Sequence, residues 1–187
     1  MVDARITHTL TALSAAILDL ASVGPISQVS VSDITRAAGI NRATFYNHFS
    51  TAGELLAAAL APELDEIRAA DHDLRDQAEL SPEEITRRAI EATVEFVARH
   101  RTVFELSLLD ERDGTLHRAL VEHLEVSSQL HIAHHARAAE QVPDAAIVAR
   151  FVAEGIVGAI ESWLATPELS QERATDAIVS ALPGWWN

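Results

Sequence analysis

The chain has 187 residues, of which 48% are hydrophobic, so it can bury a full core in one domain or in a small and a larger part. It lacks cysteine, which excludes disulfides and thiolate metal sites and suits a reducing cytoplasm. Its formal net charge of -14 has the wrong sign for binding a polyanion.

This acidic charge is unevenly distributed along the chain. Residues 1–50 contain equal numbers of basic and acidic side chains, which are Arg5, Arg36, Arg42, Asp3, Asp19 and Asp33. The rest of the chain therefore holds the whole deficit. An acidic body joined to a neutral head repels nucleic acid everywhere except near the head.

The start of the chain lacks the basic residues and the continuous apolar run of a signal peptide. The most apolar later segment, residues 145–164, is interrupted by Arg150, Glu154 and Glu161, and such charges are costly in hydrocarbon. We therefore expect a soluble, cytoplasmic protein without a membrane span.

Hydrophobic periodicity predicts an all-α chain of about nine helices, because alanine is abundant and valine and isoleucine rarely alternate with polar residues. The first helix covers about 3–22 and ends at Gly24-Pro25. The other expected limits are about 31–38, a short helix from Arg42, then 52–75, 81–100, 100–109, 115–140, 143–166 and 170–182.

Two of the short helices meet at a turn that contains glycine. Ser30 with Asp33 three residues later resembles a capping box, which starts a helix at Val31. Gly39 ends this helix, and Asn41 is a good N-cap for the next one. Two short helices joined in this way predict a helix-turn-helix.

The sequence around this turn resembles the signature of the TetR family of bacterial transcription regulators. The resemblance is carried by AGINRATFYNHFSTAGELL at residues 38–56, together with Ser30, Ile34 and the small pair Ala15-Ala16. It implies a fold of TetR type, with a three-helix DNA-binding head at 1–51 and a larger helical bundle at 52–187. In that family the bundle binds an effector and forms the dimer.

The second short helix offers side chains suited to DNA, and the residues expected to meet it are Ser30, Ser32, Arg42, Ala43, Thr44, Tyr46, Asn47 and His48. Arg42 can bind guanine or phosphate, Asn47 can pair with adenine, and methyl groups on the helix can meet thymine. Tyr46 and His48 carry donors for phosphate oxygens, and the two serines stand beside free N–H groups at a helix start. The residues expected to pack the head are Ile34, Ala37, Ile40, Phe45 and Phe49.

One position departs from the family pattern. Members of the family commonly carry lysine at the start of the fourth helix, where it meets the DNA backbone, but this chain has Ala52. With one phosphate contact missing and few arginines in the head, we expect a shallow salt dependence and weak non-specific affinity.

The last two long elements of the body predict a dimer surface. Small residues there allow close approach of a second helix, and the expected interface is Phe151, Gly155, Gly158, Ala159 and Ser162. A helix of this kind can also be buried in the core of one chain. However, a palindromic operator is bound by a protein with twofold symmetry, which favours a homodimer.

An effector pocket is expected between the helices of the body. Apolar spacing suggests that it is lined by Phe96, Phe104, Leu108, Leu124 and Trp163, although core packing explains each of them equally well.

Four histidines, His123, His131, His134 and His135, recur near one face of the helix expected at 115–140. This spacing suits a transition metal or an acidic ligand, but histidines exposed to solvent explain it more simply, so no metal is predicted. The role of Trp185-Trp186 at the end of the chain is left open.

Enzyme motifs are absent: the sequence has no glycine-rich phosphate loop, no Gly-x-Ser-x-Gly and no His-Glu-x-x-His. We therefore expect no catalytic activity and no cofactor. The favoured hypothesis is a homodimeric repressor that binds a palindromic operator in double-stranded DNA and responds to a small molecule. The alternative is a ligand-binding or interaction protein whose TetR-like head has lost useful DNA affinity.

Overall fold

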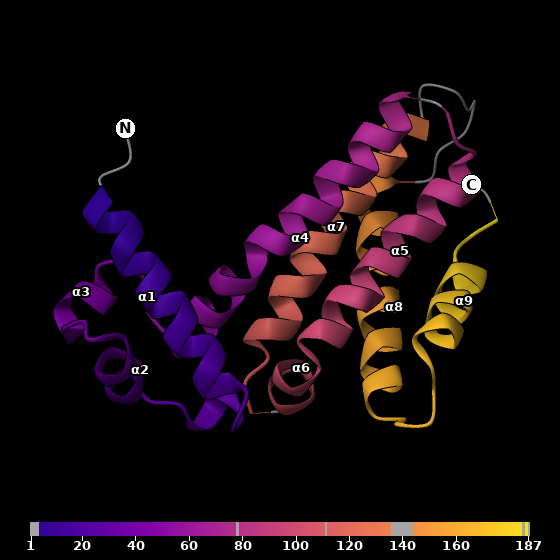
Figure 1. Cartoon of the computed structure of the whole chain (residues 1–187). Coiled ribbons are helices and arrows are strands. Elements are labelled where there is room, and N and C mark those ends of the chain that lie inside the picture. Colours follow the sequence, from indigo (N-terminus) through magenta and orange to yellow (C-terminus); the bar gives the residue numbers. More distant parts are fainter. Residues whose placement is uncertain (1–3, 78, 111, 136–143, 185, 187) are drawn as a thin grey trace. The chain divides into compact units, whose positions relative to one another are not determined.

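The computed structural model describes residues 4–77, 79–110, 112–135, 144–184 and 186, and all regular elements in these ranges are helices (Figure 1). The α-helices are α1 (Ala4–Ala21), α2 (Val31–Ala38), α3 (Arg42–Tyr46), α4 (Ala52–Gln77), α5 (Pro82–Arg99), α6 (Arg101–Ser107), α7 (Thr115–His135), α8 (Ala145–Leu164) and α9 (Gln171–Ala181). A 3-10 helix, η1 (Ile26–Gln28), was not predicted. The all-α prediction is confirmed for the described residues.

Two compact units make up the chain. Unit 1 comprises Met1–Pro62 and His100–Leu116, and unit 2 comprises Glu63–Arg99 and His117–Asn187. The helix α4 thus contributes its beginning to unit 1 and its remainder to unit 2. The functional boundary expected after residue 51 stays a prediction.

In unit 1, α1 packs against α2 and α6, and α2 packs against α3. The packed side chains are fully buried, and they include Leu13, Ile17, Ile34, Phe45 and Phe104. The predicted packing role of Ala37 is wrong: its side chain is exposed, because the buried face of the short helix α2 carries Ile34 and Thr35 instead.

In unit 2, α9 packs against α5 and α8. Apolar side chains of α5 and α8 form much of the core, and Trp163 is buried there with its indole N–H donating to the carbonyl of Leu169 at 2.9 Å. Among the described helices, none combines the length and the apolar character that a membrane crossing requires.

Candidate nucleic-acid interface and internal cavity

Local capping interactions define the two helices of the turn. The Ser30 hydroxyl accepts from the Asp33 N–H at 3.2 Å, and the Asp33 carboxylate accepts from the Ser30 N–H at 3.3 Å, so the predicted capping box is present. Gly39 ends α2 at φ 67°, a left-handed conformation that glycine adopts without strain. The Asn41 side chain then accepts from the Thr44 N–H at 2.7 Å and starts α3.

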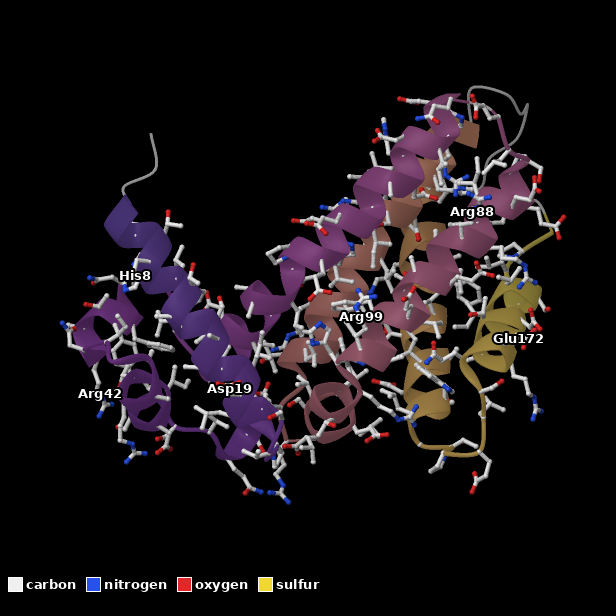
Figure 2. The ribbon with its side chains drawn as sticks, viewed as in Figure 1. His8, Asp19, Arg42, Arg88, Arg99 and Glu172 are labelled. Carbon is white, nitrogen blue, oxygen red and sulfur yellow. The ribbon has the colours of Figure 1, made fainter. Side chains whose placement is uncertain are left out.

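The helix α3 buries one aromatic ring and exposes most of its other side chains. Phe45 is fully buried, with the Tyr46 ring packed edge-on against it at 5.4 Å between centroids. Arg42, Ala43, Tyr46 and Asn47 are exposed, as the sequence predicts for a recognition helix. Figure 2 shows the Arg42 side chain on the outer side of the α2–α3 pair.

The Arg42 guanidinium lies between two hydroxyl groups, one from Ser32 of α2 and one from Tyr46 at the end of α3. Its Nη1 donates to the Ser32 hydroxyl at 3.3 Å, and its Nη2 lies 3.5 Å from the Tyr46 hydroxyl. Ser32, Arg42 and Tyr46 therefore form one exposed polar cluster across α2 and α3. A cation between two hydroxyls can bind phosphate or the edge of a guanine with little reordering.

The start of α2 is a less open anion site than the sequence suggests. The hydroxyl of Ser30 is engaged with Asp33, and Arg36 forms an ion pair with the same carboxylate. The hydrogen bonds from Ser30 hold the pKa of Asp33 below its usual value, with Arg36 acting in the same direction, so the carboxylate is charged. A phosphate would meet this negative charge, which favours Ser32 over Ser30 as the serine that contacts DNA.

Comparison with known protein families identifies this unit. The family model for bacterial regulatory proteins of the tetR family matches residues 13–59, which span the second half of α1, the whole turn and the beginning of α4. Residues 13–59 thus form a helix-turn-helix domain of the TetR family. The match spans all eight residues for which a DNA contact is predicted.

A curated relative and several solved structures agree with this family. The chain is 45% identical over 56 residues to the uncharacterized HTH-type transcriptional regulator YxbF of Bacillus subtilis (strain 168), a match that spans 29% of this chain and 15% of that relative. A TetR-family regulator of Syntrophomonas wolfei superimposes with TM-score 0.73 at 18% identity, covering 93% of this chain and 92% of that one. A TetR regulator from Rhodococcus sp. RHA1 gives 0.64 at 17% identity, covering 95% and 94%. These solved structures share the fold of both units.

Unit 2 contains a partly open cavity between α4, α5 and α7, which Ile156 of α8 and the C-terminal residues Leu182 and Trp186 also line. The centre of a water molecule can occupy about 70 Å³ inside it. Its apolar wall consists of Leu64, Ile67, Ala89, Ile90, Leu124, Ile156, Leu182 and Trp186. Its polar wall consists of Arg68, Asp71, Arg75, Thr86, Thr93, His123, Ser127, Ser128 and His131.

The predicted pocket residues fall into two groups. Leu124 lies in the wall of this cavity. Phe96, Phe104, Leu108 and Trp163 are buried side chains that do not line it, and two of them belong to unit 1. Whether these four contact an effector stays a prediction, because apolar spacing marks a buried face without telling a packed one from a hollow one.

The polar wall on α4 was missed at the sequence level. Arg68, Asp71 and Arg75 were not among the predicted pocket residues, yet Arg75 is only 9% exposed. A signal was available: Asp71 and Arg75 continue, at intervals of four residues, the inward row that includes Leu60, Leu64 and Ile67. Charged residues in register with an apolar row indicate a polar interior site.

The histidines of α7 have separate partners. His131 stacks on the Trp186 ring at 4.0 Å between centroids, and its Nε2 donates to the Trp186 carbonyl at 2.7 Å. The His123 Nδ1 accepts from Arg68 at 3.1 Å, and His134 is exposed. The side chain of His135 and Trp185 lie outside the described residues. Within the described residues, no cluster of three or more His, Asp or Glu side chains has a geometry that could bind a metal ion.

One face of α8 presents the residues predicted for the dimer. Phe151 is 72% exposed and Ile147, one turn earlier, is 70% exposed. Gly155 and Ser162 are also exposed, while Gly158 and Ala159 are half-buried. We call Ile147, Phe151, Gly155, Gly158, Ala159 and Ser162 the α8 face. Whether it is a dimer interface stays a prediction.

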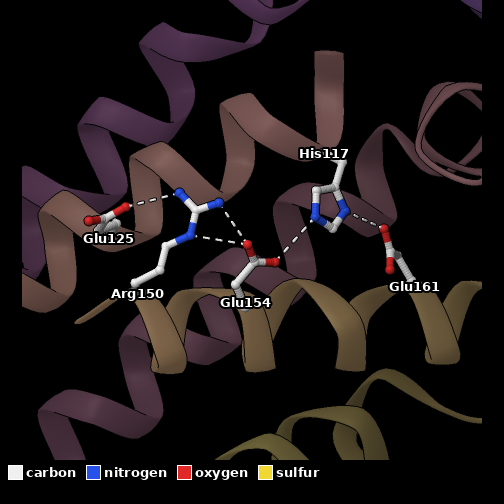
Figure 3. A network of polar contacts seen from close by, with 5 residues as sticks. All are labelled: His117, Glu125, Arg150, Glu154 and Glu161. Atoms are coloured by element: carbon white, nitrogen blue, oxygen red, sulfur yellow. Dashed lines mark hydrogen bonds and ion pairs between the residues drawn. The ribbon is translucent and has the colours of Figure 1, made fainter. Parts of the chain in front are cut away.

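A polar network beside the α8 face ties α8 to α7 (Figure 3). His117 on α7 bonds through Nδ1 to Glu161 at 2.7 Å and through Nε2 to Glu154 at 3.3 Å. Arg150 joins Glu154 to Glu125 of α7, with its Nη1 3.2 Å from the Glu125 carboxylate. Three carboxylates thus share two cations, so the network is most favourable when His117 is protonated.

This network predicts a pH-dependent stability. The hydrogen bond to Glu161 raises the pKa of His117, against the opposing effect of partial burial and with help from Glu154. Because the folded-state pKa is raised, the stabilisation is fully present below the unfolded-state pKa of about 6.5 and is lost as pH rises through the higher folded-state value. We expect His117→Gln to lower the free energy of unfolding at pH 5.5 and to approach the parent protein at pH 9, measured by urea unfolding. A constant difference across that range contradicts this role.

Proposed function

We propose that this protein is a one-component transcriptional regulator. Two copies bind a palindromic operator through α3, and a small molecule in the cavity of unit 2 changes the geometry of the two heads and releases the DNA. In this proposal the protein represses transcription and catalyses no reaction. Release follows when the ligand has higher affinity for the geometry that does not fit the operator.

The observation that supports DNA binding most directly is the exposed cluster of Ser32, Arg42 and Tyr46 on a TetR-type helix-turn-helix. Phosphate contacts from such groups fix the register of the helix, and contacts from Arg42 and Asn47 to base edges would select the sequence. Twofold symmetry of an operator then requires a dimer, for which the α8 face supplies exposed apolar surface.

An alternative function is favoured by a different observation. Unit 1 has few cations on the helix-turn-helix, Asp33 stands at the start of α2, and Ala52 replaces the usual lysine at the start of α4. A head with these features can keep its fold and lose useful DNA affinity. The protein would then act as a ligand-binding or interaction protein.

A selection from a random pool of duplex DNA separates these two functions. At low salt we expect enrichment of one palindrome, followed by a salt titration of that duplex. The three arginines of residues 1–50, doubled in a dimer, limit the slope of log K against log salt to about -5. If no palindrome is enriched at any salt concentration, the alternative function holds.

Variants of the exposed cluster test the assignment of α3. We expect Arg42→Ala to weaken operator binding by about 5- to 150-fold, since a good base or phosphate contact from arginine is worth about 1–3 kcal/mol. Tyr46→Phe removes one hydroxyl and a support of Arg42, so we expect a loss of about fivefold. Both are measured by fluorescence anisotropy with the selected duplex.

The matched control is Arg112→Ala, which removes the same charge from an exposed position in the loop after α6. We expect operator affinity within about twofold of the parent protein, because the changed charge contacts no base. Equal losses in Arg112→Ala and Arg42→Ala would indicate a general charge effect and reject α3 as the reading helix.

A further inference from the structure

Arg75 is a buried cation with one side of its guanidinium occupied and the other open. Its side chain is 8% exposed, and its Nε and Nη2 donate to the two oxygens of Asp71 at 3.0 and 2.8 Å. A guanidinium has five N–H donors, so this pair uses one edge and leaves the fork formed by Nη1 and the second hydrogen of Nη2. Within the described residues, Arg75 has no second partner.

Arg75 lines the cavity and also the adjoining hollow bounded by His72, Asp76 and His134. A planar fork of parallel N–H groups matches the two oxygens of a carboxylate. The open edge of the Arg75 guanidinium has no protein partner in the described residues, so it is available to an anionic group that enters the cavity.

The cavity wall contains two arginines, although the body is acidic. The wall contains Arg68 and Arg75 but only one carboxylate, Asp71, although acidic residues outnumber basic ones in the chain as a whole. Burial lowers the pKa of His123, and the positive charge of Arg68 lowers it further, so this histidine is neutral and accepts from Arg68. Arg68 is paired with Asp65, which does not line the cavity, and Arg75 is paired with Asp71. The groups of the wall that can bind an anion are therefore the two arginines and not His123.

A second unsatisfied group lies in the same wall. The Thr86 hydroxyl on α5 is buried and has no hydrogen-bond partner in the described part of the chain. The rest of the cavity lining consists of aliphatic side chains and Trp186. Its free volume of about 70 Å³ corresponds to the space of roughly five water molecules, which suits an apolar group of similar size.

We propose that the ligand of this cavity is a small amphipathic carboxylate whose anionic group binds the open fork of Arg75 and whose apolar part fills the space beside Trp186. A cationic ligand would bring like charge against Arg75 and Arg68. A neutral apolar ligand would leave the buried Thr86 hydroxyl and the free edge of Arg75 without a partner. This inference deepens the proposed function, since it rests on that function for the role of the ligand as effector, whereas binding itself requires no DNA.

Calorimetry on the full chain tests the inference with benzoate, benzamide and benzylamine, which share a ring and differ in charge. We expect benzoate to bind at least tenfold more tightly than benzamide and benzylamine to show no binding. In Arg75→Gln we expect benzoate affinity to fall at least tenfold and benzamide affinity to stay within twofold. Hexanoate, hexanamide and hexylamine repeat the comparison with a flexible chain.

Two further variants show whether a loss of carboxylate binding comes from the missing guanidinium of Arg75 or from an indirect effect. Arg75→Gln leaves Asp71 without its cation, so the double variant Arg75→Gln with Asp71→Asn removes both charges and should fold while lacking the preference for carboxylates. Arg87→Gln removes an exposed cation from α5 and should retain the preference. Equal affinity for benzoate and benzamide in the parent protein, tighter binding of benzylamine, or an unchanged preference in the double variant would each overturn the inference.

The result of the carboxylate-binding experiment is independent of the result of the DNA selection. Carboxylate binding that needs Arg75, in a protein that enriches no palindrome, supports this inference and rejects the proposed regulator. An enriched operator in a protein without carboxylate preference supports the regulator and rejects this inference.

Discussion

Replacing Phe151 with aspartate is expected to convert the proposed dimer into monomers and to abolish tight binding to a palindromic operator. Phe151 is 72% exposed in the single chain, so its folding does not depend on this ring. In a dimer built on the α8 face, the ring would be an aromatic anchor, and losing such an anchor costs at least about 2 kcal/mol, or about 30-fold in the dissociation constant. A buried unpaired carboxylate adds to that cost.

Analytical ultracentrifugation over a range of concentrations measures the dissociation constant, and circular dichroism confirms that helix content is unchanged. The matched control is Val23→Asp, which places the same carboxylate at an apolar position that is 80% exposed in unit 1. We expect this control to remain dimeric. Should Phe151→Asp associate as strongly as the control, the dimer must use another surface.

The glycines of the α8 face add a separate reason to place a second helix there. A Cβ at Gly155 or Gly158 would meet no atom within 4 Å, so packing inside the described chain does not require glycine at either position. Glycine in a helix interior costs about 1 kcal/mol relative to alanine. Two such costs on one exposed face are explained if a second backbone approaches closely, which agrees with the proposed twofold assembly.

The helix-turn-helix was predictable because its determinants are local. Ser30 with Asp33, then Gly39, then Asn41 each act on a backbone group within three or four residues, so their positions in the sequence almost determine the geometry. The burial of Phe45 and the exposure of Arg42 follow once α3 is placed on the rest of unit 1. The contact between Arg42 and Ser32 was not predictable, since it depends on the angle between two helices.

The cavity was not predictable, because a hollow is a property of several helices together. Apolar spacing led to Phe96 and Trp163, which are large side chains that fill their surroundings. The site instead involves Arg75, whose charge normally indicates a solvent-facing position. The structure shows that residues of α5 and α7 line the same cavity as this part of α4. Because of this packing, the ion pair between Arg75 and Asp71 is buried.

Phe45→Ala is expected to have the largest effect on the helix-turn-helix itself. Phe45 is fully buried, and its ring lies 5.4 Å from Tyr46 and 6.0 Å from Phe49 between centroids. Truncating a buried phenylalanine to alanine costs about 3–5 kcal/mol, because the lost contacts leave a void that only partly collapses. That is a large fraction of the stability of a domain, so we expect α3 to lose its fixed position and operator binding to vanish.

Stability and affinity must be measured together to separate this scaffold role from direct contact with DNA. For Phe45→Ala, urea unfolding should show the lost free energy, and hydrogen exchange should show faster exchange of the α3 amides. Phe45→Leu keeps most of the buried volume and should retain most of both stability and affinity. Tyr46→Phe should lose affinity with little change in stability, since the Tyr46 ring is half exposed and only its hydroxyl is removed. If Phe45→Ala binds the operator as tightly as the parent protein, the recognition surface does not depend on the packing of α3, and the reading of DNA must be assigned to another part of unit 1.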